Sequence, residues 1–112
     1  MHYLHPDLFM NYLQILQKFA TKVRAEYPEA RIFAFGSYPR GTATEESDLD
    51  VCVVLKELKP EDRLVISDLA WETGFEYDIL ISTIVVSAAE YENGPISASP
   101  LMESIRTEGV AA

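Results

Sequence analysis

Hydrophobic residues recur along the chain in two spacings, one typical of helices and one typical of strands. From Asp7 to about Tyr27 the apolar positions follow a helical repeat, and Pro28 is placed to end that helix. Residues 31–35 then form a short run of aromatic and β-branched side chains, which indicates a buried strand. The chain is therefore expected to open with a long helix followed by a strand.

The segment from Asp48 to Leu55 predicts a second strand, acidic at its start and apolar afterwards. Because the apolar part does not alternate with polar residues, both faces of this strand are expected to be buried. Cys52, the only cysteine, lies within it and is interpreted as a small buried hydrophobe. A disulfide framework and a cysteine-based metal site are thereby excluded.

A further helix and a third strand are predicted next. The helix would begin near Pro60 and end at Gly74. The strand would cover residues 75–83, where large apolar residues alternate with polar ones such as Asp78. The residues expected on the buried side of the helix are Leu64, Val65, Leu69 and Trp71. In the strand, Phe75, Tyr77, Ile79 and Ile81 alternate with Glu76, Asp78, Leu80 and Ser82.

The last part of the chain predicts a helical turn near residues 87–91 and a final helix. Ser99 would cap that helix, and Gly109 would end it, with Leu101, Met102 and Ile105 facing inward. The order of helix, strand, strand, helix, strand and helix predicts an α/β (α+β) fold. We expect one domain over residues 1–112, with a small mixed sheet flanked by helices.

Charge narrows the choice of partner. Nine basic residues stand against eighteen acidic ones, for a net charge of −9, and the basic residues are scattered. Proteins that bind nucleic acid need a basic surface, so nucleic acid is not expected as the main partner. No apolar run is long enough to cross a bilayer and no secretory signal is evident, so a cytoplasmic setting is expected.

Two acids near the start of the second strand are the first candidates for chemistry. Asp48 and Asp50 are two residues apart, so their side chains should leave the same face. Adjacent carboxylates repel, and a divalent cation with a preference for oxygen, Mg²⁺ or Mn²⁺, would compensate them. The alternative is a pair of solvated acids at a strand edge.

Gly36, Ser37 and Arg40 follow the first strand and are candidates for holding phosphate. A glycine lets the backbone approach a ligand, serine offers a hydroxyl and an amide, and a guanidinium can bind phosphate oxygens in bidentate fashion. Alternatively, Gly36 and Ser37 form a plain tight turn in which Ser37 caps a helical turn, and Arg40 is an exposed arginine without a ligand. Their order directly after a strand favours the phosphate site.

Asp78 is the third candidate acid, set within an apolar segment where a carboxylate needs a partner or a metal. An anion-binding turn, paired metal ligands and a third acid are the parts of a two-metal phosphoryl-transfer site. Whether Asp78 points toward the other two acids depends on strand order, which the sequence leaves open.

The spacing of these residues resembles a known signature. Gly36-Ser37, ten residues, and then Asp48-Leu49-Asp50 are similar to the G-S-x10-D-x-D motif of nucleotidyltransferases related to DNA polymerase beta. The stretch GSYPRGTATEESDLDVCVVL looks like the version in minimal nucleotidyltransferases (the MNT domain). The helix ending Ile105 to Val110 is similar to the I-x-x-E-G-V of the short members.

This resemblance implies a nucleotidyltransferase fold and a role for each candidate residue. Gly36 and Ser37 would hold nucleotide phosphates, with Arg40 beside the phosphate or the acceptor. Asp48 and Asp50 would bind metal, and Asp78 would bind a second ion or act as general base.

Short members of this family are often antitoxins paired with HEPN-type (HEPT) toxins, which they neutralise by transferring AMP from ATP to a toxin tyrosine. The resemblance therefore implies a protein adenylyltransferase whose cofactor is Mg²⁺ or Mn²⁺, in a hetero-oligomer or as a homodimer. Two alternatives stay open: a catalytically silent module that sequesters a toxin, and a dimeric nucleotidyltransferase acting on a small molecule.

Overall fold

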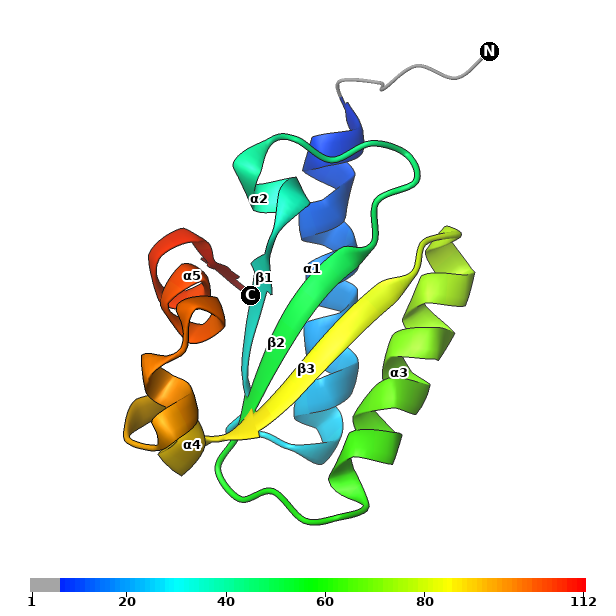
Figure 1. Ribbon diagram of the computed structural model, residues 1–112. Coiled ribbons are helices and arrows are strands. Elements are labelled where there is room, and N and C mark those ends of the chain that lie inside the picture. Colours follow the sequence, from blue (N-terminus) through cyan, green and yellow to red (C-terminus); the bar gives the residue numbers. More distant parts are fainter. Residues whose placement is uncertain (1–6) are drawn as a thin grey trace.

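The computed structural model describes the backbone of residues 7–112 and the side chains from residue 12 onward. Helices and strands alternate through the first part of the chain, and three helices in succession precede the last strand (Figure 1). They are α1 (Asp7–Glu26), β1 (Arg31–Phe35), α2 (Ser37–Arg40), β2 (Leu49–Leu55), α3 (Asp62–Tyr77), β3 (Ile81–Ser87), α4 (Ala88–Glu92), the 3-10 helix η1 (Pro95–Ala98), α5 (Pro100–Glu108) and β4 (Val110–Ala111).

The four strands form one mixed sheet in the order β3-β2-β1-β4. β1 pairs antiparallel with β2 and β4, whereas β2 and β3 run parallel. The register places Phe35 opposite Asp50 and Asp50 opposite Ser82. The predicted small mixed sheet flanked by helices is confirmed.

Helices cover both faces of this sheet, as the unbroken apolar run in β2 predicts. Val51 and Val53 pack in the core cluster that includes α1 and α3. Cys52 and Val54 pack in a second cluster with residues of α4 and α5. In Figure 1, α1 and α3 lie on one side of the strands and α4 and α5 on the other. Asp50 alternates in step with Cys52, so its side chain leaves β2 on the α5 side.

The end of α3 differs from the sequence prediction. The helix does not stop at Gly74 but continues to Tyr77, so Phe75 and Tyr77 are helical and β3 starts only at Ile81. Asp78 ends the helix in the left-handed conformation, at φ 55°, and its N–H donates to the Gly74 carbonyl. A short polar side chain tolerates that conformation, so the helix ends without a terminal glycine.

The buried side of α3 also differs from the prediction. The helix packs inward through Ile66, Ala70 and Thr73, which are largely small. Leu64 and Trp71, expected in the core, are 70% and 65% exposed. Of the large apolar residues of α3, Ile66 is buried, whereas Leu64, Trp71 and Phe75 lie on its outer side.

The C-terminal segment follows the prediction with two differences. Ser99 accepts a hydrogen bond from the Met102 N–H at 3.2 Å and caps α5, and Met102 and Ile105 are buried. Leu101, expected inside, is exposed, and the short strand β4 was not predicted. Within the described residues, none of the helices is both long and apolar enough to span a bilayer.

Candidate active site

The turn after β1 brings the backbone of Gly36 against the carboxylate of Asp50. Gly36 has φ 80° and ψ −142°, a combination that favours glycine. A β-carbon built on Gly36 would lie 2.5 Å from Oδ2 of Asp50, so only glycine leaves room for this approach. The turn is closed by the Thr42 N–H, which donates to the Ser37 carbonyl at 3.0 Å. The turn and the acid therefore form one unit.

Asp48 and Asp50 lie close enough to affect each other. Asp50 is half-buried, and Asp48 is exposed just before β2. Burial raises the pKa of Asp50 above its ordinary value, the charge of Asp48 raises it further, and the Arg40 guanidinium acts in the opposite direction. The structure thus brings together a pair of carboxylates and one cation beside the glycine turn.

Arg40 forms an ion pair with a residue of α5. Its Nε lies 3.3 Å from Oε1 of Glu108, near the end of α5. Glu108 belongs to the helix-ending motif noted in the sequence, but no role was predicted for it. The ion pair connects that motif to Arg40, whose charge acts on Asp50.

Tyr38 is the buried residue of α2, the short helix that follows Gly36. Its ring is buried, and its hydroxyl donates to the Ser47 carbonyl at 3.4 Å. Burial raises the pKa of the phenol, and the charge of Asp48 adds to the effect. Sequence reasoning passed over Tyr38, although it lies inside the signature.

Asp78 does not join the acid pair. The expectation that it lies on a strand was wrong, since it is the exposed residue that ends α3. Among the residues that the structure describes, no group of three acidic, histidine or cysteine side chains is placed to hold a metal ion. The β3 residue opposite Asp50 is Ser82, four positions further along. The predicted cluster of three aspartates is therefore replaced by a pair.

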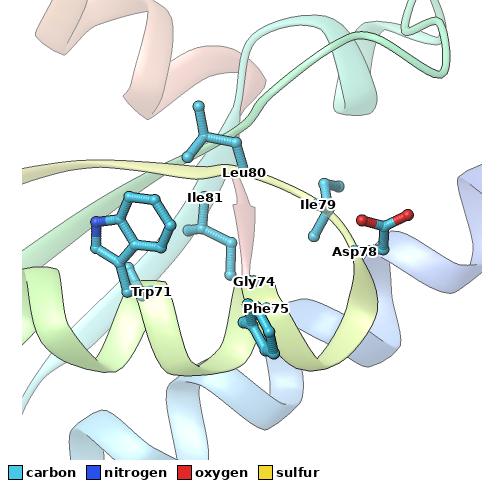
Figure 2. Close-up of a pocket in the computed structure, with 8 residues that line it drawn as sticks. Trp71, Gly74, Phe75, Asp78, Ile79, Leu80 and Ile81 are labelled. Atoms are coloured by element: carbon cyan, nitrogen blue, oxygen red, sulfur yellow. The ribbon is translucent and has the colours of Figure 1, made fainter.

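Asp78 instead borders two cavities at this end of the molecule. One cavity has a volume of about 390 Å³ and is also lined by Tyr38 and Glu45. The charge of Asp48 contributes to the raised pKa of Tyr38, so this cavity extends toward Asp48. The other, of about 490 Å³, lies between α3 and the start of β3 (Figure 2). Asp78 is thus a wall residue of these cavities and no member of the acid pair.

The carboxylate pair fits a hard divalent cation. Two carboxylates commonly hold Mg²⁺ when phosphate oxygens complete its coordination. Burial and the charge of Asp48 both disfavour the charged form of Asp50, and a bound cation would favour it. Asp48 and Asp50 thus have the chemistry to bind such an ion together with a nucleotide.

Comparison with known proteins identifies the family to which this chain belongs. Residues 16–103 match the family described as "Nucleotidyltransferase domain". The chain belongs to this family and is a nucleotidyltransferase. The resemblance based on the glycine-serine turn and the paired aspartates is confirmed.

Two relatives come from Methanocaldococcus jannaschii. "Putative protein adenylyltransferase MJ0141" is 34% identical over 79 residues, which cover 68% of this chain and 80% of that protein. "Putative protein adenylyltransferase MJ1305" is 40% identical over 78 residues, covering 64% of this chain and 52% of that protein. This chain therefore spans about half the length of the second relative.

Solved structures share the fold. The structure described as "a putative nucleotidyltransferase from Sulfolobus solfataricus" superposes with a TM-score of 0.63, at 19% identity, over 99% of this chain and 89% of that chain. A mutant of the toxin-antitoxin MntA-HpeT gives 0.57 at 25% identity, over 86% of this chain and 69% of that chain. A toxin-antitoxin structure with AMP-PNP gives 0.54 at 25% identity, over 83% and 68% of the two chains.

Proposed function

We propose that this chain transfers AMP from ATP to a hydroxyl of a partner protein, as the antitoxin of a HEPN-type toxin–antitoxin pair. The observation that carries the proposal is the contact between Gly36 and the Asp50 carboxylate, with Asp48 and Arg40 beside it. The names of the relatives support AMP transfer to protein, and the MntA-HpeT neighbours support a toxin as the acceptor.

In this proposal Gly36 and Ser37 hold the phosphates of ATP, and Arg40 neutralises one of their oxygens. Asp48 and Asp50 bind Mg²⁺ or Mn²⁺, which, when bound, screens the negative charge that develops on the phosphates. In this arrangement the phosphates of ATP would be held beside the acid pair.

The acceptor hydroxyl attacks the α-phosphorus in line with the bond to the β-phosphate. A new oxygen–phosphorus bond forms, the bond to the β-phosphate breaks, and pyrophosphate leaves. Asp78 is the proposed acceptor of the hydroxyl proton, because it borders the cavity that reaches Tyr38 beside Asp48. The products are the adenylylated protein, pyrophosphate and a proton.

Transfer of label tests the proposal. The chain is incubated with ATP labelled at the α-phosphate, Mg²⁺ and the purified product of the reading frame that neighbours its own. We expect the wild-type chain to label the partner. The double variant that carries both Asp48→Asn and Asp50→Asn should leave the partner unlabelled. Glu57→Gln, which removes an exposed acid from a loop, should behave like the wild type. Absence of label with the wild-type chain would contradict the proposal.

A second candidate is sequestration of the toxin without chemistry. It is favoured by one observation, the separation of Asp78 from the acid pair. Neutralisation of the toxin by the Asp48→Asn, Asp50→Asn variant would support it. Loss of neutralisation in that variant, with binding retained, would support catalysis.

A further inference from the structure

A row of exposed side chains lies on the outer side of α3. Leu64, Trp71 and Phe75 are 70%, 65% and 86% exposed. Asp68 is also exposed, and it falls between them in the helical repeat, so the four share one side of the helix. Leu80, 51% exposed, continues the row from the turn before β3. We call these five residues the α3 patch.

The fold does not need these large apolar side chains. Packing of α3 against the sheet is made by Ile66, Ala70 and Thr73, on the other side of the helix. Neighbouring exposed tryptophan, phenylalanine and leucine side chains are typical of a surface that another protein covers.

The α3 patch continues to the face that carries the acid pair. The Leu49 N–H donates to the Leu80 carbonyl at 2.9 Å, so Leu80 lies beside the residue between Asp48 and Asp50. Figure 2 shows the Leu80 and Ile81 side chains leaving the chain on opposite sides. Ile81 packs in the core cluster that includes α1 and α3. Leu80 therefore turns toward the other face of the sheet, where Asp50 projects.

A cavity joins the two parts of the patch. It has a volume of about 490 Å³, and its walls include Trp71, Phe75 and Leu80. Figure 2 shows Asp78 at the opposite end of this cavity from Trp71. A side chain inserted beside Trp71 would thus lie in the same cavity as Asp78.

Charge indicates what covers the patch. The chain carries a net charge of −9, and in the described part of it no ion pair involves Asp68. A second copy would oppose Asp68 and Asp78 to acids of an equally negative chain, which is unfavourable. A basic protein with an apolar surface would compensate both the exposed acid and the exposed rings.

We propose that the α3 patch docks the acceptor protein, a basic protein that covers Trp71 and Phe75 with apolar side chains and pairs a lysine or arginine with Asp68. Docking there holds an acceptor hydroxyl next to Asp78 and the acid pair. This inference rests on the proposed function and identifies the surface by which the acceptor is bound.

Calorimetry with the purified product of the neighbouring reading frame tests the docking separately from the transfer. Two variants are compared with the wild type: the double variant Leu64→Ser, Phe75→Ser and the single variant Asp68→Lys. Each should raise the dissociation constant about tenfold or more, as expected for central interface residues. Leu101→Ser is the matched control, because Leu101 is an exposed leucine on α5, across the sheet. It should bind like the wild type.

Two readouts separate docking from a general loss of structure. Trp71 is the only tryptophan, so its emission should shift to shorter wavelength when the partner covers it. In the transfer assay, the α3 patch variants should raise the KM for the acceptor protein and leave the KM for ATP unchanged.

The outcomes distinguish this inference from the proposed function. Wild-type binding without transfer of label, lost in the patch variants, would support the docking surface and overturn the proposed chemistry. Transfer that the patch variants leave unchanged would overturn the docking surface alone. Absence of binding by the wild-type chain, or an equal loss in Leu101→Ser, would also overturn it.

Discussion

Gly36 and Asp50 fit together so closely that the glycine has no substitute. A β-carbon at Gly36 would lie 2.5 Å from Oδ2 of Asp50, and the backbone there has φ 80°. The glycine of the turn thus makes room for one of the two carboxylates, in addition to any role in binding phosphate. The two halves of the signature, ten residues apart, act as one piece of structure.

Gly36→Ala should therefore abolish activity for a steric reason. The alanine methyl group would displace Asp50, and misplacement of a reacting group by about 1 Å costs on the order of a hundredfold in rate. The left-handed strain should add about 1–2 kcal/mol of destabilisation. Transfer rates and urea denaturation measure the two effects.

Gly41→Ala is the matched control for that variant. Gly41 has φ 79° and nothing within 4 Å of a built β-carbon. Gly41→Ala should lose stability through its left-handed backbone alone and keep nearly full activity. Equal activity losses in both variants would mean that backbone strain, and not the contact with Asp50, is responsible.

The raised pKa of Asp50 predicts how stability depends on pH. Its pKa in the folded chain lies above the ordinary value of 3.8, so the folded state holds this proton more tightly than the unfolded state. The contribution of Asp50 to the free energy of unfolding should be fully present below pH 3.8 and fall as the pH rises through the folded pKa.

Asp50→Asn should remove this loss and be more stable than the wild type at pH 7. Urea denaturation of both proteins between pH 3.5 and 7, with the range chosen about the ordinary value of 3.8, measures the difference. Added Mg²⁺ and ATP should stabilise the wild type and not the variant. A variant less stable than the wild type at pH 7 would contradict this prediction.

Arg40 and Glu108 should act together on nucleotide binding. Arg40→Ala should raise the KM for ATP about tenfold, the usual effect of losing a charged hydrogen bond. Glu108→Gln frees the guanidinium without removing it, so an increase of about threefold is expected, with little change in stability. A double-mutant cycle on the KM measures their coupling.

An ion pair far from the turn provides the comparison for that cycle. Nζ of Lys56 lies 3.5 Å from Oε2 of Glu29, and both side chains are exposed. Lys56→Gln should leave the KM for ATP unchanged. Additive effects of Arg40→Ala and Glu108→Gln would show that Glu108 does not position the arginine.

Asp78→Asn tests the proposed proton acceptor. Asparagine adopts the left-handed conformation found here, at φ 55°, so the turn should be preserved while the charge is lost. The kcat should fall about a hundredfold or more, with the KM for ATP unchanged. Glu76→Gln, which removes a neighbouring exposed acid, should retain its kcat. An unchanged kcat in Asp78→Asn would leave this residue only its role in ending α3.

The residues that could be predicted from the sequence are those whose geometry is local. Gly36, Asp48 and Asp50 belong to the ends of adjacent strands, and the apolar run after Asp50 indicates a central strand. Hydrogen bonding between β1 and β2 then fixes their positions. Short-range patterns were sufficient for this half of the site.

The region around Asp78 could not be predicted in the same way. Phe75 and Tyr77 alternate with acids as strand residues do, but both are exposed residues in the last turn of a helix that ends at an aspartate. Trp71 was predicted to lie in the core, whereas α3 packs through Ile66, Ala70 and Thr73 and leaves Trp71 65% exposed. Glu108 forms an ion pair with Arg40 because α5 packs on the sheet. The two residues are far apart in the sequence, so no local pattern predicts this contact.

The most direct test of the central claim is the binding of Mn²⁺, followed by electron paramagnetic resonance with and without AMP-PNP. The wild-type chain should bind the ion and the nucleotide cooperatively. Asp48→Asn with Asp50→Asn should lose the bound ion and weaken the nucleotide, and Glu57→Gln should keep both. Equal binding of Mn²⁺ and AMP-PNP by the doubly substituted chain and the wild type would contradict the assignment of Asp48 and Asp50 as the metal ligands.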